Sequence, residues 1–209
     1  MRILAVDVGT GTQDILLFDT ERQAENCFKL VMPSPTMMVA KQVKEATRRQ
    51  NVPLLLTGVT MGGGPSHWAV RDHAAAGNPV FATPDAARTF DDDLDRVSEM
   101  GIEAIEADEV RGLRARFGDL LELELRDFDY GLLARSMEPF GLDLTVDGIA
   151  AAVFDHGAAP PEVSDRQFRF DYLDEHIRRD NQLSGFGFTP ADIPDSMTRL
   201  QAVASSAAQ

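Results

Sequence analysis

Cysteine, long apolar runs and basic residues are all scarce in this sequence. The single cysteine, Cys27, excludes a disulfide within the chain and is typical of a protein from a reducing compartment. No apolar run approaches the ~20 residues that a membrane-spanning helix needs. Asp7 interrupts the N-terminal stretch that would have to form the apolar part of a signal peptide. We therefore expect a cytoplasmic protein without a membrane partner.

The shortage of positive charge bears on possible partners. The chain has 20 Lys and Arg residues against 34 Asp and Glu residues, a formal net charge of −14. A field of this sign repels nucleic-acid backbones, so we expect no nucleic-acid partner. It does not exclude a small phosphate ligand, because backbone amides and a metal ion can dominate inside a pocket.

The apolar pattern predicts an α/β fold. Residues 2–8 and 13–19 flank a Gly-containing turn as a hairpin does, and residues 26–32 are typical of a third strand. Further strands are expected at 53–60, 78–82, 102–106, 120–125 and 142–154, and helices at 36–50, 66–76, 83–100, 130–137, 163–181 and from Asp195 onward. This order predicts three antiparallel strands followed by parallel strands with crossover helices. We expect one domain over residues 1–209, with an insertion or subdomain at about 80–142.

The hairpin turn is the sharpest functional signal. Gly9 and Gly11 allow a tight turn whose amides can point at phosphate oxygens, and Thr10 and Thr12 add hydroxyl donors. Asp7, at the end of the first strand, can hold Mg²⁺ directly or through water. The alternative is a hairpin whose Asp and Thr side chains only satisfy the turn.

Two other connections carry candidate binding or catalytic residues. Gly62, Gly63 and Gly64 lie between a strand and a helix, where amides can bind an anion. The alternative is a flexible connection or a close backbone crossing. Asp155 and His156 follow a strand, where Asp155 can orient or deprotonate a water and His156 can bind phosphate. The alternative is an Asp-Gly turn with a solvated histidine. We expect Asp7 and Asp155 to face one crevice from neighbouring strand ends.

Several other polar and aromatic residues have weaker signals. Asp91, Asp92, Asp93 and Asp95 are typical of an acidic first helical turn, with a metal site as the alternative. Asp14 opens an apolar strand and either is a surface residue or lines the same pocket as Asp7. Trp68 is expected in the core. The spacing of His67 and His73 does not fit a paired metal site on one helix face.

Several motifs of the sequence resemble those of a known protein superfamily. Residues 3–12, Ile-Leu-Ala-Val-Asp-Val-Gly-Thr-Gly-Thr, resemble the first phosphate motif of the actin, hexokinase and chaperone ATPase superfamily. The resemblance implies an RNase H-like fold, with ATP and Mg²⁺ held at this hairpin and Asp7 organising the metal. Residues 60–65, 92–94, 100–102 and 154–157 resemble an uncharacterised family within that superfamily, whose members are often labelled pyruvate formate-lyase activating enzymes. Only Cys27 is present, whereas a radical iron–sulfur activase needs three clustered cysteines.

The resulting functional hypothesis is a Mg²⁺-dependent, nucleotide-phosphate-binding domain of an actin-type ATPase or kinase-like protein, with an unknown acceptor. The alternatives are a metal-dependent nuclease of the same fold and a non-catalytic scaffold. No second strand ending in Asp-x-Gly-Thr follows Thr12. Proteins of the superfamily clamp nucleotide between two copies of the fold. We therefore expect the chain alone to be incomplete, needing a second half or self-association.

Overall fold

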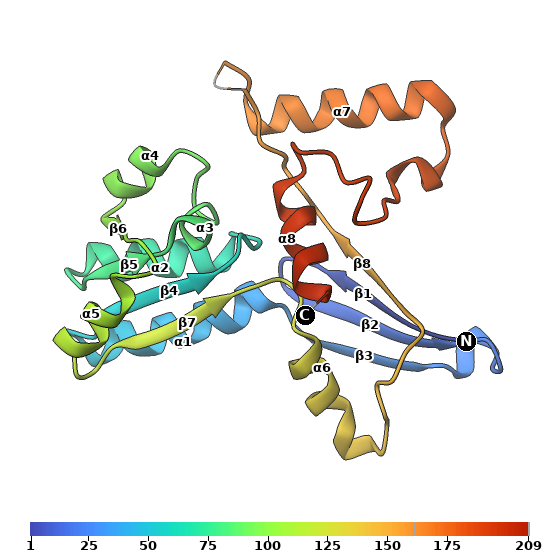
Figure 1. Ribbon diagram of the computed structural model, residues 1–209, viewed down its shortest axis with the longest axis horizontal. Coiled ribbons are helices and arrows are strands. Elements are labelled where there is room, and N and C mark those ends of the chain that lie inside the picture. The colour runs from blue at the N-terminus through green and yellow to red at the C-terminus, as the bar shows by residue number, and fades with distance from the viewer. Residues whose placement is uncertain (161, 209) are drawn as a thin grey trace.

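The computed structural model describes residues 1–160 and 162–208, and within them the strands form two four-stranded sheets that lie side by side (Figure 1). We call them sheet A and sheet B. The coarse expectation of an α/β fold with parallel strands and crossover helices is confirmed. No helix in the described part of the chain combines the length and apolar character needed to cross a bilayer.

Sheet A contains the predicted N-terminal hairpin. Its strands are β1 (Arg2–Val8), β2 (Thr12–Asp19), β3 (Phe28–Pro33) and β8 (Gly148–Val153), in the order β3-β2-β1-β8. β2 runs antiparallel to both β1 and β3, and β8 runs parallel to β1. Along β1 the side chains alternate between buried and more exposed, which is the pattern of a strand with one covered face.

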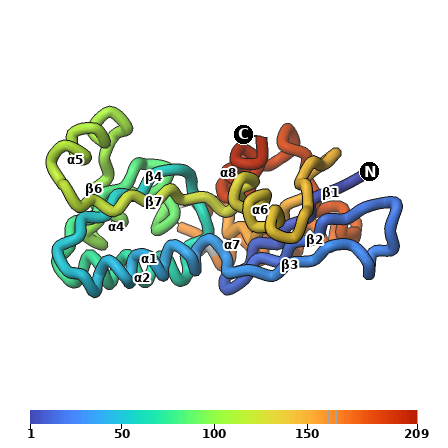
Figure 2. Tube along the Cα trace, turned by 90° about the horizontal axis from the view of Figure 1, so that it is seen from below, coloured from blue at the N-terminus to red at the C-terminus, as the bar shows by residue number. Residues whose placement is uncertain are grey.

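Sheet B is entirely parallel. Its strands are β4 (Leu54–Gly58), β5 (Val80–Ala82), β6 (Ile102–Ala104) and β7 (Leu121–Leu125), in the order β6-β5-β4-β7. The helices in this part of the chain are α1 (Pro35–Arg49), α2 (Pro65–Ala75), α3 (Pro84–Ala87), α4 (Leu94–Glu99) and α5 (Val110–Arg116). α1 and α2 pack together along one side of the sheet (Figure 2).

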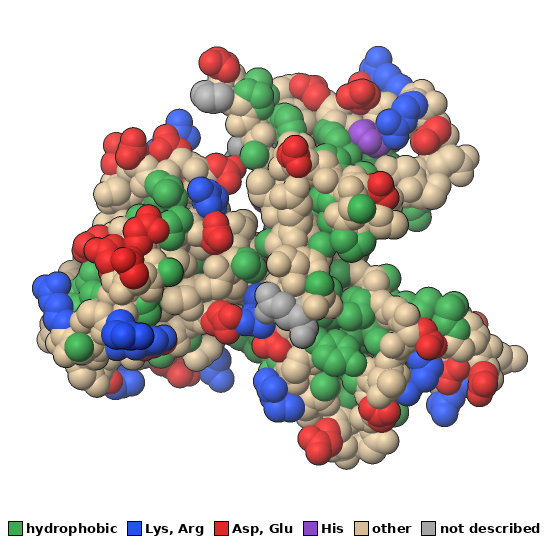
Figure 3. Space-filling view, viewed as in Figure 1, with side chains coloured by type: hydrophobic (Ala, Val, Ile, Leu, Met, Phe, Trp, Pro, Cys, Tyr) green, Lys and Arg blue, Asp and Glu red, His purple; other side chains and the backbone are tan. Residues whose placement is uncertain are grey.

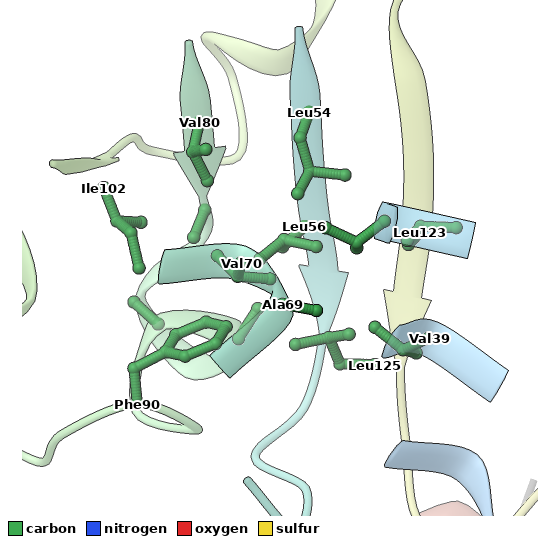
Figure 4. Close-up of a cluster of buried hydrophobic side chains, with 14 of the residues drawn as sticks. Val39, Leu54, Leu56, Ala69, Val70, Val80, Phe90, Ile102, Leu123 and Leu125 are labelled. Atoms are coloured by element: carbon green, nitrogen blue, oxygen red, sulfur yellow. The ribbon is translucent and has the colours of Figure 1, made fainter. Parts of the chain in front are cut away.

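Apolar side chains cover both faces of sheet B. Leu54 and Leu56 pack in one cluster with Val39 of α1 and Val70 of α2 (Figure 4). Leu55, between them, packs in a separate cluster with residues of α5. All three leucines are fully buried. β4 is apolar along its whole length because both of its faces are buried, as is usual for a central parallel strand.

The parallel strands predicted to follow the three antiparallel strands do not all join the same sheet, and the difference begins at β4. This strand pairs with β5 and β7, and the strand beside β1 is β8. The separate sheet therefore begins before residue 80, the expected start of an insertion. An apolar run predicts that a strand is buried, but its partner depends on contacts with distant parts of the chain.

Sheet A is covered on one face only. α6 (Tyr130–Met137) and α8 (Thr198–Ala207) contribute Leu133, Met137 and Val203 to a core with Leu4 and Val6 of β1. The opposite face carries partly or fully exposed side chains from all four strands. The remaining described elements are η1 (Ala24–Asn26), η2 (Glu138–Phe140), α7 (Asp165–Asp180) and η3 (Leu183–Phe186).

Two helix boundaries differ from the predictions for local reasons. The helix expected over 83–100 is two short helices, because the Asp91 and Asp93 carboxylates accept hydrogen bonds from the amides of Asp93 and Asp95 and so compete with helical bonding. Asp93 is the N-cap of α4. The last helix begins at Thr198 with Met197 as its N-cap, and not at Asp195.

Candidate functional site

A cleft of about 470 Å³ lies where the carboxyl ends of sheet B face the end of β8. Its lining includes Gly62, Gly63, Asp155 and His156, which come from two of the motifs selected from the sequence, and Gly157. The surface is indented between the part over α4 and the part over α7 (Figure 3). The fold thus brings together two motifs that lie about ninety residues apart, in a space of ligand size.

Packing explains the glycines of the loop that leads from β4 to α2. A Cβ on Gly62 would lie 2.5 Å from Nη2 of Arg199, so no larger residue fits without displacing that guanidinium. Gly64 has a φ of +55°, and a Cβ there would lie 3.3 Å from Cγ2 of Thr10. Gly62 is therefore needed because a side chain packs closely against it, and not because another backbone crosses it, while Gly64 marks the contact between this loop and the N-terminal hairpin.

A buried ion pair fixes the floor of the cleft. Asp127, 1% exposed in its side chain, accepts hydrogen bonds from Nε of Arg199 at 2.6 Å and from Nη2 at 3.1 Å. Its carboxylate also accepts from the Gly62 amide at 3.0 and 3.2 Å. Nη1 of Arg199 donates to the Phe154 carbonyl at 2.6 Å. This pair connects the glycine loop, the segment after β7, the end of β8 and α8.

Sequence reasoning missed both members of this pair. Asp127 had a usable signal, because it is an acidic residue two positions after the end of β7, a strand of the parallel sheet. Arg199 had none, since one arginine near a helix start is common and its partner lies 72 residues away.

The Asp155 carboxylate has structural partners on both oxygens. Oδ1 accepts from the Gly157 amide at 2.9 Å, and Oδ2 accepts from the Leu200 amide at 2.7 Å in the first turn of α8. Nδ1 of His156 lies 2.8 Å from Nη1 of Arg169, and its ring packs edge-on against Phe154. Asp155 therefore connects the start of α8 to the end of β8. The catalytic roles of Asp155 and His156 stay predictions.

The hairpin turn is anchored to the start of α1 and to the glycine loop. Within the turn, the Gly9 amide donates to the Thr12 carbonyl at 2.9 Å. Ser34 makes two hydrogen bonds to the turn. Its amide donates to the Gly11 carbonyl at 3.1 Å, and its hydroxyl donates to the Thr10 carbonyl at 2.8 Å. Thr36 in α1 donates its hydroxyl to the Gly63 carbonyl and accepts from the Ser66 amide at 3.0 Å. Two glycine-containing segments are thereby held next to each other.

Asp7 and Asp14 lie directly opposite each other on β1 and β2. Both line a second hollow of about 470 Å³ on the uncovered face of sheet A, among apolar side chains and Lys29. Both alternatives stated for Asp14 therefore hold, since it is an exposed residue and lines the same hollow as Asp7. Like charges placed directly opposite in an antiparallel pair repel, so this arrangement costs stability unless a cation is nearby.

The expectation that Asp7 and Asp155 face one crevice was wrong. Asp7 lies on the face opposite Leu4 and Val6, whereas Asp155 bonds α8, which packs on the Leu4 and Val6 face. Ala152 of β8 is the register partner of Asp7, so the two side chains lie on the same face of sheet A. Side chains alternate between the two faces along a strand, and Asp155, three residues after Ala152, therefore falls on the opposite face.

The remaining sequence candidates have simple environments. Trp68 is 58% exposed, so its expected core position was wrong. His73 is fully buried, and His67 packs edge-on against Phe90. Burial lowers the pKa of His67 and the Arg71 guanidinium lowers it further, while Asp91 opposes both. In the described part of the chain, no group of three or more His, Cys, Asp or Glu side chains is arranged to hold a metal ion.

Comparison with known proteins gives one family. No curated protein and no solved structure matches the chain significantly. A family description, "Putative pyruvate format-lyase activating enzyme (DUF1786)", matches residues 61–209. The matched region contains the glycine loop, the Asp127–Arg199 pair and the whole cleft lining except Thr60, while the N-terminal hairpin lies before it. Because this match covers more than half of the chain, the protein belongs to the DUF1786 family.

Proposed function

We propose that the chain binds the phosphate groups of a nucleotide at the N-terminal hairpin turn, together with Mg²⁺. The observation that carries this proposal is the contact between the turn and the glycine loop through Thr10 and Gly64. The hairpin turn and the glycine loop come from distant parts of the sequence, and they meet at one exposed place. Phosphate sites in proteins are commonly built in this way from clustered backbone amides.

Unused hydrogen-bond donors support a phosphate at this place. Among the described residues, the amides of Thr10, Gly11, Gly63 and Gly64 have no acceptor. Residues 9–12 are exposed along the whole turn. An anion there would satisfy donors that otherwise rely on water.

The residues of the hairpin also fit a magnesium ion. Mg²⁺ in nucleotide sites is held by one or two carboxylates together with phosphate oxygens and water. Asp7 and Asp14 supply two opposed carboxylates within the same hairpin, and the Thr12 hydroxyl lies 3.4 Å from Oδ2 of Asp14. When bound, the ion would neutralise phosphate charge and the repulsion between the two carboxylates. Asp155 is not part of this proposed metal site, because it lies on the other face of sheet A.

The topology of sheet A supports the finer fold proposal. Three antiparallel strands followed by a fourth strand parallel to β1 are the order expected for an RNase H-like sheet. We propose that sheet A is the RNase H-like, actin-type part of the chain. The phosphate turn is open on one side, so we expect weak binding by this chain alone and stronger binding when a second surface closes the site.

The activity in the family description does not fit these residues. A radical iron–sulfur activase holds its cluster with three cysteines, and the chain has only Cys27, which is buried beside β2. We therefore derive no step through such a cluster.

Calorimetric titration of the purified chain with ATP, with and without Mg²⁺, tests the proposal. We expect Mg²⁺-dependent binding that Asp7→Ala weakens at least tenfold. Asp91→Ala is the matched control, because Asp91 is an acidic residue that lines the cleft beside α4 and is not part of the hairpin. Equal binding by both variants and the wild type would leave the hairpin with a structural role only. A parallel titration with labelled DNA tests the nuclease alternative, which the net charge of −14 disfavours.

A further inference from the structure

The outer edge of β8 is unpaired. β8 is the last strand in the order β3-β2-β1-β8, with β1 on one side only. Within the described residues, no backbone hydrogen bond joins the other side of β8 (Gly148–Val153) to a neighbouring segment. An edge of this kind presents a row of free N–H and C=O groups that can pair with another strand.

A groove runs along this edge. It has a volume of about 810 Å³, and every residue from Val146 to Ala151 lines it. Successive side chains of a strand point to opposite faces, so a hollow on one face would be lined by alternate residues. Lining by consecutive residues shows that the groove follows the backbone edge of the strand.

The walls leave room for a narrow occupant. The groove is also walled by Phe186 and Phe188, at and just after η3, and by Val203 and Ala204 of α8. The β8 residues in the groove are mostly Gly and Ala. Hydrophobic side chains gather in the hollow on the right of the molecule (Figure 3). Because the edge is recessed between two walls, a single extended segment fits more readily than the edge of another folded sheet.

Charge around the groove is acidic. The groove lining has one charged side chain, Asp147, whose carboxylate accepts a hydrogen bond from the Arg2 amide at 2.7 Å. Asp143 is exposed five residues before the strand. Thr145 lowers the pKa of Asp143 by hydrogen bonding to its carboxylate, and the nearby Arg2 guanidinium, the basic group at this end of the groove, lowers it further. Asp192 and Asp195 are exposed in the segment that supplies Pro190 and Ile193 to the groove. Basic residues on either side of an apolar segment would complement this rim.

We propose that the groove binds an extended, apolar peptide segment of a partner protein, flanked by basic residues, which pairs with β8 through its main chain. The free backbone groups of β8 require an occupant in extended conformation, and the apolar walls require apolar side chains on it. The acidic residues at the rim favour positively charged residues at both ends of the bound segment. This proposal is independent of nucleotide binding, since the groove lies on β8 and the phosphate site on the β1–β2 turn.

Fluorescence anisotropy with a labelled synthetic peptide, Lys-Val-Ala-Val-Ala-Val-Lys, tests the proposal. The control peptide has the same sequence with alternate amides N-methylated, so it keeps the side chains but cannot pair along one edge. We expect the methylated peptide to bind at least tenfold more weakly. Ala204→Trp, which obstructs the groove, should weaken binding at least tenfold, whereas Ser205→Trp, on the exposed side of α8, should leave it unchanged.

Hydrogen exchange provides a readout that does not depend on the variants. Bound peptide should slow exchange of amides within residues 148–153, with no comparable change in β3, the other edge of sheet A. Equal affinity for both peptides would overturn the proposal in favour of a purely apolar ligand. No binding, or binding without protection of β8, would also overturn it. A dimer in light scattering that Ala204→Trp abolishes would identify a second copy as the occupant and would overturn the proposal.

Discussion

Sheets A and B each contain four strands but are buried in different ways. In sheet B, the adjacent residues Leu54, Leu55 and Leu56 are all fully buried, because helices cover both faces. In sheet A, Leu4 and Val6 are buried, whereas Ala5 and Asp7 between and beyond them are not. The comparison shows which parts of the chain have surface left for other molecules.

The cause of the difference is the type of connection. Parallel neighbours in sheet B are joined by crossover segments containing helices, which cover the sheet faces. The strands β1, β2 and β3 are joined without crossover helices, so nothing in these connections covers the second face. The proposed metal carboxylates lie on that uncovered face, whereas the proposed strand-binding groove follows the β8 edge of sheet A beside α8.

The largest expected effect is at the ion pair between the two sheets. Asp127→Ala leaves the Arg199 guanidinium, 13% exposed, without its carboxylate, and we expect unfolding in urea to need less free energy. Breaking a buried pair typically costs about 3–5 kcal/mol. The control is Asp119→Ala, which removes an exposed pair with Arg49 and should cost less than about 1 kcal/mol. Similar losses in both variants would mean that the buried pair does not hold the sheets together.

Leucine truncation compares the two sheets directly. Leu55→Ala removes a fully buried side chain from sheet B and should lower the free energy of unfolding by about 2–5 kcal/mol. Leu16→Ala removes a half-buried side chain from the open face of sheet A, where the loss should stay below about 1 kcal/mol. Chemical denaturation of both variants measures the difference. A large loss at Leu16 would show that the open face is covered in solution.

A smaller effect is expected at the glycine loop. Gly62→Ala places a methyl group against Arg199, and overpacking of this kind costs about 1–3 kcal/mol. Gly11→Ala is the comparison in the hairpin, because a Cβ there meets no atom within 4 Å. Thermal unfolding should separate the two. Equal stability of both variants would mean that Arg199 shifts freely, and the cleft floor would then not be fixed.

The smallest expected effect is a pH dependence confined to the sheet B side. Burial lowers the pKa of His73 from 6.5, although a hydrogen bond to the Val52 carbonyl opposes this. Neutral His73 therefore contributes stability that is fully present above pH 6.5 and declines as pH falls below it, because the unfolded chain takes up the proton first. His73→Gln should flatten the dependence of the urea midpoint on pH between 5 and 8. An unchanged slope would assign the dependence to other groups.

Local structure was readable from the sequence. The spacing of apolar residues predicted α6 at residues 130–137, as observed, and the turn between residues 8 and 13 predicted the β1–β2 hairpin. A close approach at the glycines 62–64 was one of the alternatives stated, and the structure identifies the neighbours of Gly62 and Gly64 as the side chains of Arg199 and Thr10. These features depend on residues within a few positions of one another, so propensity and periodicity suffice.

What the amino-acid order determined by itself was most of the helices and strands and the glycine-containing turns, although α5 was not predicted. Only the tertiary structure decided that β4 joins a second sheet, that Asp155 holds α8 while Asp7 lies on the other face of sheet A, and that Arg199 pairs with Asp127 across 72 residues. Each of these outcomes depends on which distant segments bury each other's apolar surface. That choice is made by the packing of the whole chain, because local propensities are the same whichever partner a strand or a charge finally meets.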